Sequence, residues 1–170
     1  MAGGGAGGAV SAPSLVAVAA GVLARLGAQG STVAAAESLT GGLLAATLTA
    51  VPGASRVFRG GLVVYATDLK ASIGGVPPDM LAEHGPVSAP VAQALADSVR
   101  HRLGASYGVA LTGVAGPDRQ DGRPVGTVYV GLAGPDGHQV RLLDLPGDRD
   151  QIRASSVLAA LRLLAEELPA

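Results

Sequence analysis

The sequence predicts a single α/β domain with three layers, in which a mixed β-sheet is covered by helices on both faces. Its 170 residues are enough for one compact domain. Short apolar runs typical of buried strands alternate with segments of helical periodicity, an order typical of α/β folds. Near the C-terminal end, two strand-like runs flank Gly134-Pro-Asp-Gly137, whose turn residues predict an antiparallel hairpin. The predicted sheet is therefore mixed.

The N-terminal part of the chain predicts a tail followed by a helix. Residues 1–13 are rich in glycine and alanine, carry no charged side chain and show no periodicity, so we expect a disordered tail and a domain over residues 14–170. The apolar run 15–24 is too short for the roughly 20 residues that cross a bilayer. We predict a packed helix that Gly27 and Gly30 end.

Composition and charge exclude several functions. The chain carries 12 basic and 13 acidic side chains without a basic block, which argues against a nucleic-acid partner. It contains no cysteine, which excludes disulfides, thiolate metal ligands and a cysteine nucleophile. The first basic residue is Arg25, so the basic start of a signal peptide is missing, and we expect a cytoplasmic protein without membrane contact. Lys70 is the single lysine, and it invites a functional explanation because lysine can lose its proton where arginine cannot.

The next segments predict a strand, a turn, a helix and a second strand. Residues 32–37 form a small apolar run suited to a buried strand, and Ser38-Leu-Thr-Gly-Gly42 leads into a helix over 43–49. Ser38 is thus expected at a strand-to-helix junction. Residues 60–66 predict a second buried strand, which Thr67-Asp-Leu-Lys70 follows on a turn or short helix.

The second half predicts a helix, three strands and a closing helix. Ser88 is expected to cap a helix over 91–103, and residues 107–111 predict a third strand before a polar loop that ends at Arg123. The hairpin strands are expected over 125–132 and 138–145, and the closing helix over 148–168 with an inward face of Ile152, Leu158, Leu161 and Leu164.

Several standard chemistries are excluded by their motifs. The sequence contains no phosphate-binding loop, dinucleotide fingerprint, zinc-peptidase helix or nucleophile elbow. His84, His101 and His138 lie on different predicted elements, and we interpret them as surface or structural histidines. We therefore predict neither a metal nor a cofactor.

Ser38 is the candidate nucleophile. Free backbone N–H groups and the dipole of a helix N-terminus can stabilise an oxyanion that develops there. An ordinary N-cap serine is the alternative interpretation. Lys70 could activate such a serine if it is buried and neutral, because desolvation lowers the pKa of a lysine. A solvated turn residue is the alternative for Lys70.

Two further positions could bind an anion. Thr112 and the glycines around it, Gly113 among them, could bring backbone N–H groups close to an anion or could form a plain Gly-Pro turn. Arg149 stands beside Asp148 and Asp150 at the start of the last helix, where it could bind a phosphate or pair with these neighbours.

A series of ordered motifs carries a family resemblance. The motifs are Ala36-Glu-Ser-Leu-Thr-Gly-Gly42, Val51-Pro-Gly-Ala-Ser55, Phe58-Arg-Gly-Gly61, Tyr65-Ala-Thr-Asp-Leu-Lys70, His84-Gly-Pro-Val-Ser88, Thr112-Gly-Val-Ala-Gly-Pro117, Pro124-Val-Gly-Thr127 and Gly147-Asp-Arg149. In this order they resemble the C-terminal domain of the competence/damage-inducible protein CinA, a family that contains the nicotinamide-nucleotide amidases. The likeness covers residues 15–168, and the ordered series is far more specific than any single motif.

The resemblance implies an α/β domain that hydrolyses the carboxamide of nicotinamide mononucleotide to nicotinic acid mononucleotide and ammonia, in pyridine nucleotide salvage and without a metal. By position, Ser38 matches the nucleophile and Lys70 the base. The other positions that it places at the site are Tyr65, Thr112 and Arg149, and we predict a catalytic role for Tyr65. We add Gly113 as a substrate-binding candidate, and the backbone N–H groups of Thr40, Gly41 and Gly42 as the candidate oxyanion hole. The family also suggests a homo-oligomer.

The chain departs from the commoner family pattern at three places: Leu39, where cysteine is frequent, residues 66–68, and a shortened loop after Asp118 that bears on substrate specificity. Two other functions stay open. A non-catalytic nucleotide-binding or regulatory module, linked to competence or the DNA damage response, would keep the pocket without turnover, although the presence of both Ser38 and Lys70 argues against it. A general small-amide hydrolase would differ only in needing no phosphate.

Overall fold

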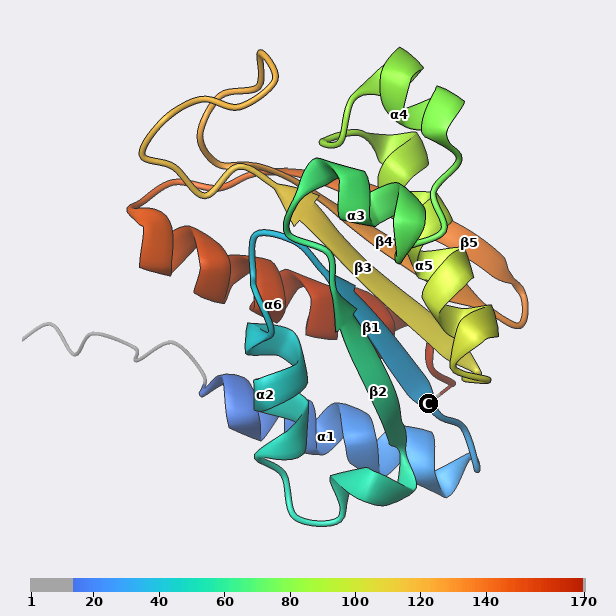
Figure 1. Ribbon diagram of the computed structural model, residues 1–170. Helices are drawn as coiled ribbons and strands as arrows, with labels where there is room; N and C mark the ends of the chain where they lie inside the picture. Colours follow the sequence, from blue (N-terminus) through green and yellow to red (C-terminus); the bar gives the residue numbers. More distant parts are fainter. Residues whose placement is uncertain (1–13, 170) are drawn as a thin grey trace, which may run out of the picture.

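A computed structural model describes residues 14–169, so the expected tail over 1–13 lies outside the described residues. The sheet has five strands in the order β2-β1-β3-β4-β5 (Figure 1). The strands are β1 (Val33–Glu37), β2 (Phe58–Val63), β3 (Tyr107–Gly113), β4 (Thr127–Gly134) and β5 (Gly137–Asp144). The helices are α1 (Leu15–Ala28), α2 (Leu43–Thr49), the short 3₁₀ helix η1 (Ala54–Arg56), α3 (Thr67–Ser72), α4 (Pro78–His84), α5 (Ala89–Arg102) and α6 (Arg149–Glu167).

The predicted three-layer arrangement is confirmed. Helices α1, α2 and α6 cover one face of the sheet, and α5 covers the other with α3 and α4 beside it (Figure 1). Strand β1, which lies between β2 and β3, is buried along its whole length and contributes alternate residues to both cores. Val33 and Ala35 pack on the side of α1 and α6, and Ala34 and Ala36 pack on the side of α5.

Helix α5 lies unusually close to the sheet because two strand positions are glycine. A Cβ atom at Gly108 would stand 2.1 Å from the carbonyl oxygen of Ala96, and one at Gly131 would stand 2.4 Å from that of Ala92. Real Cβ atoms do not approach that closely, so the backbone of α5 rests directly on β3 and β4. Glycine at these two strand positions thus permits the close packing of this layer.

The strand order creates a crevice at one end of the sheet. Strands β1, β2 and β3 are parallel, whereas β4 and β5 add to β3 as the predicted antiparallel hairpin. From β1 the chain crosses through α2 to β2 on one side, and it returns through α3, α4 and α5 to β3 on the other. Parallel sheets bind ligands outside the carboxyl ends of their strands where the order reverses in this way. That point lies between the ends of β1 and β3.

The second strand differs from the prediction in position and burial. It runs over Phe58–Val63 instead of residues 60–66, and its residues alternate between exposed and half-buried. The pairing with β1 begins at Val33 and ends where Glu37 meets Val63, because β1 itself stops there. As an edge strand, β2 has one partner only, which explains its exposure.

The first helix also differs from the prediction at its end. It continues through Gly27, which was expected to end it, and stops at Ala28, before Gly30 with a φ of +65°. A glycine inside a helix costs about 1 kcal/mol. Burial of Leu23 and Leu26 against the core outweighs that cost.

Smaller differences concern helix ends and faces. Ser88 precedes α5 as predicted, but its hydroxyl donates to the carbonyl of Gly85 and makes no cap. Helix α4 was not predicted, since its seven residues bury no side chain completely and show no apolar stripe. In α6, Ile152, Leu161 and Leu164 are buried as expected, whereas Leu158 is half-buried and Val157 takes the core position.

Candidate active site

Ser38 directly follows β1, at the crevice where the strand order reverses. Its N–H donates to the carbonyl of Leu111 in β3 at 2.9 Å, so the start of the turn is still tied to the sheet. The side chain is 6% exposed. The predicted strand-to-helix junction is therefore confirmed.

Ser38 does not cap the helix that follows. Helix α2 begins only at Leu43, and its N-cap residue is Gly42. Gly41 and Gly42 have φ values of +57° and +103°, a backbone conformation that residues other than glycine rarely adopt. The interpretation of Ser38 as an N-cap serine is wrong, and its hydroxyl is not used for capping.

Lys70, on α3, reaches Ser38 from the other side of the crevice. Its side chain is 2% exposed, which excludes a solvated turn residue. Its Nζ atom donates to Ser38 Oγ at 3.0 Å and to the carbonyl of Val64 at 3.2 Å. The two residues that the sequence singled out as nucleophile and base are thus in direct hydrogen-bond contact in a buried position.

The surroundings of Lys70 favour its neutral form. Burial lowers the pKa of its amine below the ordinary value, and the negative charge of Asp121 opposes this with a smaller upward effect. A neutral amine keeps a lone pair, which rotation about the last side-chain bond can present to the Ser38 hydroxyl while an N–H still donates to Val64. This arrangement can accept a proton from the serine.

The lowered pKa predicts the sign of two pH dependences. Between the lowered native pKa and the ordinary pKa of about 10.4, the unfolded chain binds a proton at Lys70 that the native protein does not, so the free energy of unfolding should rise with pH. Lys70→Met should remove that part of the slope in urea titrations across this window. Any reaction that uses the neutral amine of Lys70 as a base should slow in the wild type as pH drops through the lowered pKa. Identical stability slopes in the two proteins would contradict the lowered pKa.

A cavity of about 100 Å³ opens beside Ser38. Four residues that the sequence placed at the site line it: Ser38, Tyr65, Gly113 and Arg149. No individual role was predicted for the other lining residues, which are Leu39, Val114, Ala115, Gly116, Asp118 and Gln120. Residues from the ends of β1, β2 and β3 and from the start of α6 therefore meet at one hollow.

Arg149 bridges two walls of this cavity. Its Nη1 donates to the carbonyl of Gly116 at 2.6 Å, and its Nη2 donates to Tyr65 Oη at 3.0 Å. It forms no ion pair with Asp148 or Asp150, the alternative left open by the sequence. Tyr65 is 58% exposed, so this pair stands at the open rim, where it can meet a ligand.

Thr112 holds a supporting position behind the cavity. It is the sixth residue of β3, is completely buried, and donates its hydroxyl to the carbonyl of Pro86 at 2.7 Å. That bond ties β3 to the segment that precedes α5. Its neighbour Gly113 lines the cavity, whereas a contact of Thr112 with substrate stays a prediction.

The oxyanion hypothesis relied on free backbone N–H groups at the N-terminus of α2, but some of these groups already donate hydrogen bonds. Glu37 is buried, and its carboxylate accepts the N–H of Leu44 at 2.8 Å and that of Ala45 at 3.0 Å. Gly41 N–H is also engaged, because it donates to the carbonyl of Ser38. Within residues 14–169, the N–H groups that donate no hydrogen bond in the turn are those of Leu39, Thr40 and Gly42. The candidate oxyanion hole therefore loses the N–H of Gly41 and consists of the N–H groups of Leu39, Thr40 and Gly42.

Three residues of the site region were missed by sequence reasoning. The carboxylate of Glu37 accepts hydrogen bonds from the N-terminus of α2. Arg153 of α6 donates to the carbonyls of Leu39 and Thr40. Burial lowers the pKa of Lys70, and the negative charge of Asp121 partly offsets that shift. For Glu37, its place just before Ser38 was a usable signal, since a carboxylate in an apolar strand needs a partner. The other two carried no signal, because their contacts join distant parts of the chain.

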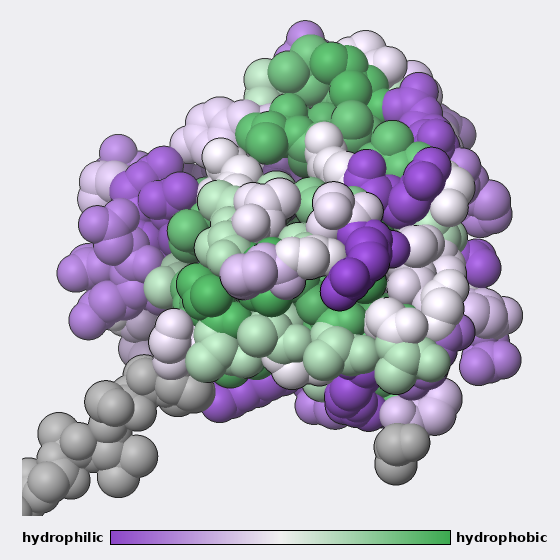
Figure 2. Space-filling view, turned by 90° about the horizontal axis from the view of Figure 1, so that it is seen from below, coloured by the Kyte–Doolittle hydropathy of each residue, from purple (hydrophilic) through white to green (hydrophobic). Residues whose placement is uncertain are grey.

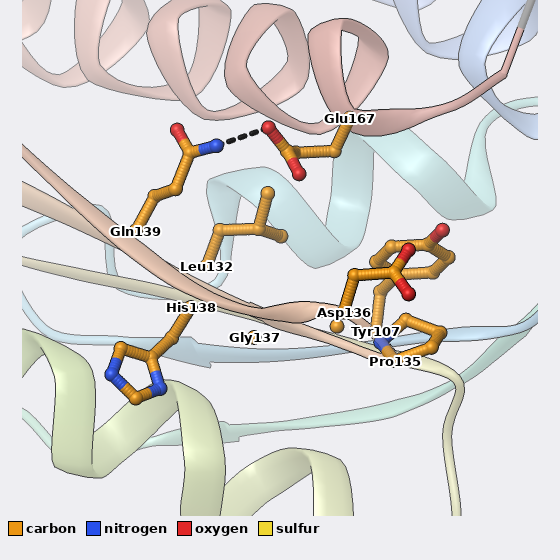
Figure 3. Close-up of a pocket in the computed structure, with 9 residues that line it drawn as sticks. Tyr107, Leu132, Pro135, Asp136, Gly137, His138, Gln139 and Glu167 are labelled. Carbon is orange, nitrogen blue, oxygen red and sulfur yellow. Dashed lines mark hydrogen bonds between the residues drawn. The ribbon is translucent and has the colours of Figure 1, made fainter.

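Two other hollows lack the chemistry of this site. One lies at the opposite end of the sheet, at the β4–β5 turn, where Glu167 faces Gln139 near Tyr107 and Asp136 (Figure 3). The other is a groove of about 470 Å³ between α1 and segment 51–57. This groove lies at the lower end of the molecule in Figure 1. Figure 2 shows that end, and apolar side chains cover much of the middle of its surface. Neither hollow pairs a nucleophile with a base.

Residues 14–169 offer neither a cluster of metal ligands nor a membrane-spanning helix. This part of the chain contains no group of three or more histidine, cysteine, aspartate or glutamate side chains placed to hold a metal ion. None of its helices is long and apolar enough to cross a membrane.

Comparison with known proteins decides the family. The family model of the CinA C-terminal domain matches residues 8–168, which is nearly the whole chain. The chain belongs to the CinA C-terminal domain family. A CinA-like protein of Frankia casuarinae is 53% identical over 147 residues, which cover 86% of this chain and 34% of that protein. A CinA-like protein of an Anaeromyxobacter species is 49% identical over 144 residues, 84% of this chain and 35% of that protein. This CinA domain thus spans about a third of the length of these relatives.

Solved structures confirm the CinA fold. The competence damage-inducible protein A of Klebsiella pneumoniae superposes with a TM-score of 0.89 at 30% identity, covering 92% of this chain and 98% of that one. The competence/damage inducible protein CihA of Agrobacterium tumefaciens superposes with a TM-score of 0.87 at 31% identity, covering 93% and 98%. The mixed sheet with helices on both faces is therefore the fold of CinA-superfamily proteins.

Proposed function

We propose that this CinA domain hydrolyses the carboxamide of nicotinamide mononucleotide, with Ser38 as nucleophile and Lys70 as general base. The contact of Lys70 Nζ with Ser38 Oγ, 3.0 Å apart and buried beside a cavity, carries the proposal. A buried amine whose pKa is lowered can take the proton of a serine that it touches. A structural lysine would instead be expected beside a carboxylate, which neutralises its charge.

The chemistry proceeds in two halves. Ser38 Oγ attacks the carboxamide carbon while its proton passes to Lys70, and the free N–H groups of the turn stabilise the oxyanion. Collapse of the intermediate breaks the C–N bond, and Lys70 returns the proton to the leaving ammonia. A water molecule then attacks the acyl-enzyme ester, losing its proton to Lys70. Collapse of the second intermediate releases the carboxylate, and the proton returns to Ser38 Oγ.

The charges around the cavity suit a nicotinamide nucleotide. A hollow of about 100 Å³ suits the nicotinamide group, so the ribose and phosphate would extend along the open rim. Arg149 stands at that rim, and its guanidinium can bind a phosphate. Asp118 lines the same cavity and can face the positive charge of the pyridinium ring.

Ammonia release tests this function and separates it from the alternatives. Purified protein should release ammonia from nicotinamide mononucleotide, more slowly from its riboside and least from free nicotinamide, and Ser38→Ala should release none. Equal rates on all three would favour a general small-amide hydrolase. Binding of the nucleotide without ammonia release would favour the regulatory module and refute the proposed activity.

Arg149→Ala should impair hydrolysis of the nucleotide more than hydrolysis of the riboside, because only the nucleotide has a phosphate that would lose its partner. We expect kcat/KM to fall by about 10-fold or more for the nucleotide, the effect of one lost charged hydrogen bond, and much less for the riboside. Steady-state kinetics on both substrates would show this difference. Equal losses would mean that Arg149 acts through its bonds to Gly116 and Tyr65 instead.

The family expectation of a homo-oligomer belongs to the same proposal. Light scattering of the purified protein, which determines its mass in solution, would test it.

A further inference from the structure

We propose that Arg153 is a positioning residue that holds the turn after Ser38 with the Thr40 N–H free to bind the oxyanion. The inference rests on the proposed amidase function and assigns a task within it to a residue outside the cavity lining. Arg153 lies one helical turn after Arg149 on α6, so the two arginines share a face of the helix. Arg149 serves the rim, and Arg153 serves the backbone of the turn.

The contacts of Arg153 are specific to two peptide groups. Its Nε donates to the carbonyl of Leu39 at 3.1 Å, and its Nη2 donates to the carbonyl of Thr40 at 3.0 Å. Its remaining Nη1 stands 3.7 Å from the exposed carboxylate of Asp150, a distant partner. The planar guanidinium thus engages two successive carbonyls of the turn through two separate nitrogens, a fixed geometry that the single nitrogen of an ammonium group does not provide.

Holding these carbonyls fixes the direction of the neighbouring N–H groups. A trans peptide is planar, with its C=O and N–H on opposite sides, and the one cis peptide bond in residues 14–169 is elsewhere, at Gly116-Pro117. Because Leu39 C=O faces Arg153, Thr40 N–H emerges on the opposite side of the turn. That N–H donates to no group within residues 14–169, and it follows the nucleophile by two residues.

The next peptide is engaged differently. The carbonyl of Thr40 faces Arg153, and the N–H of Gly41 on its far side donates to the carbonyl of Ser38 at 3.0 Å. This bond closes the turn that begins at the nucleophile. Thr40 is completely buried, backbone as well as side chain, and its hydroxyl has no hydrogen-bond partner in residues 14–169. The polar groups of Thr40 that Arg153 influences are therefore those of the backbone.

A purely structural arginine is available for comparison in the same chain. Arg25 of α1 also binds backbone carbonyls across a helix boundary, with Nη1 on Ala165 at 2.9 Å and Nη2 on Leu168 and on Pro169. It joins α1 to the end of α6, and it does not line the cavity beside Ser38. Equal substitutions at Arg25 and Arg153 therefore separate a loss of backbone support from a loss of catalysis.

The experiment compares Arg153→Met and Arg153→Lys with Arg25→Met and Arg25→Lys. The quantities to be measured are kcat and KM for ammonia release, the midpoint of thermal unfolding, and the rate at which a fluorophosphonate modifies Ser38. Misplacing one oxyanion donor should lower kcat of Arg153→Met by about 10²-fold, with KM within about twofold. Arg153→Lys, which keeps the charge and loses one of the two bonds, should lose about 10-fold. Modification of Ser38 should slow in parallel, whereas the Arg25 variants should lose stability only.

Three results would overturn the inference. They are a kcat within about twofold of the wild type in Arg153→Met, a loss carried wholly by KM, or an equal loss of kcat in Arg25→Met. The labelling arm keeps this test apart from the proposed substrate. If the wild type is labelled at Ser38 but releases no ammonia from the nucleotide, the substrate proposal fails, and the labelling rates still decide the role of Arg153. Absence of labelling in the wild type would overturn the role of Arg153 as well, because no activated serine would be present.

Discussion

Ser38→Ala and Lys70→Met should each lower kcat for ammonia release by at least about 10³-fold, because the proposed nucleophile and base would act as one unit. Ser38→Ala removes the atom that forms the ester. Lys70→Met fills a similar buried volume but has no basic amine to take the proton of the serine, which lies 3.0 Å from Nζ in the wild type. The double variant should be little slower than either single variant, since one broken step already stops the reaction.

Lys70→Arg separates a base from a positive charge. Arginine keeps the charge but does not give up its proton, so this variant should be as inactive as Lys70→Met. Single-turnover measurements of ammonia, with circular dichroism to verify folding, would check all four variants. If Lys70→Arg kept more than about a tenth of the wild-type kcat, Lys70 would act through its charge and not as a base.

Glu37→Ala should lower the free energy of unfolding by about 2–4 kcal/mol, because it leaves two N–H groups of α2 without their charged acceptor. Leu44, one of the two donors, is itself buried, so water cannot easily replace the carboxylate. Glu37→Gln keeps a single acceptor oxygen and should lose less. Urea unfolding followed by circular dichroism measures both changes.

Glu166→Ala is the matched control. Glu166 also accepts hydrogen bonds through both carboxylate oxygens, but its partner is the exposed side chain of Arg141. Exposed ion pairs contribute little to stability, so this change should leave the unfolding curve almost in place. Equal shifts for Glu37→Ala and Glu166→Ala would show that Glu37 does not stabilise α2.

Glu37 and Ser38 show how closely stability and the site are linked here. The carboxylate ties α2 to the last residue of β1, and the adjacent residue is the candidate nucleophile. The turn between them and α2 has two glycines in left-handed conformation. A loss of the Glu37 bonds should therefore disturb activity as well as folding, and Glu37→Gln kinetics at a temperature well below unfolding would reveal it.

Local patterns in the sequence were sufficient for most of the architecture. Strand β1, the hairpin of β4 and β5, and helices α1, α2, α5 and α6 follow from apolar runs, helical spacing and turn residues, which act between near neighbours. The ordered motifs were sufficient to identify the family, which the comparisons confirm. The local signal was weakest at edge strand β2 and at α4, where burial is incomplete.

The tertiary structure decided how the site is assembled. Lys70 stands 32 residues from Ser38 in the chain, and Arg153 stands 114 residues from Leu39, so no local spacing could report these contacts. The sequence singled out Ser38 and Lys70, because a lone lysine and a serine before two glycines are visible as residues. The packing of α3 and α6 against the strand ends decides three things: whether the lysine is buried, which N–H groups of the turn stay free, and which groups Arg149 contacts. Burial and hydrogen-bond geometry are properties of the packed chain, and they alone make these residues suitable as the proposed base, the proposed nucleophile and the candidate oxyanion hole.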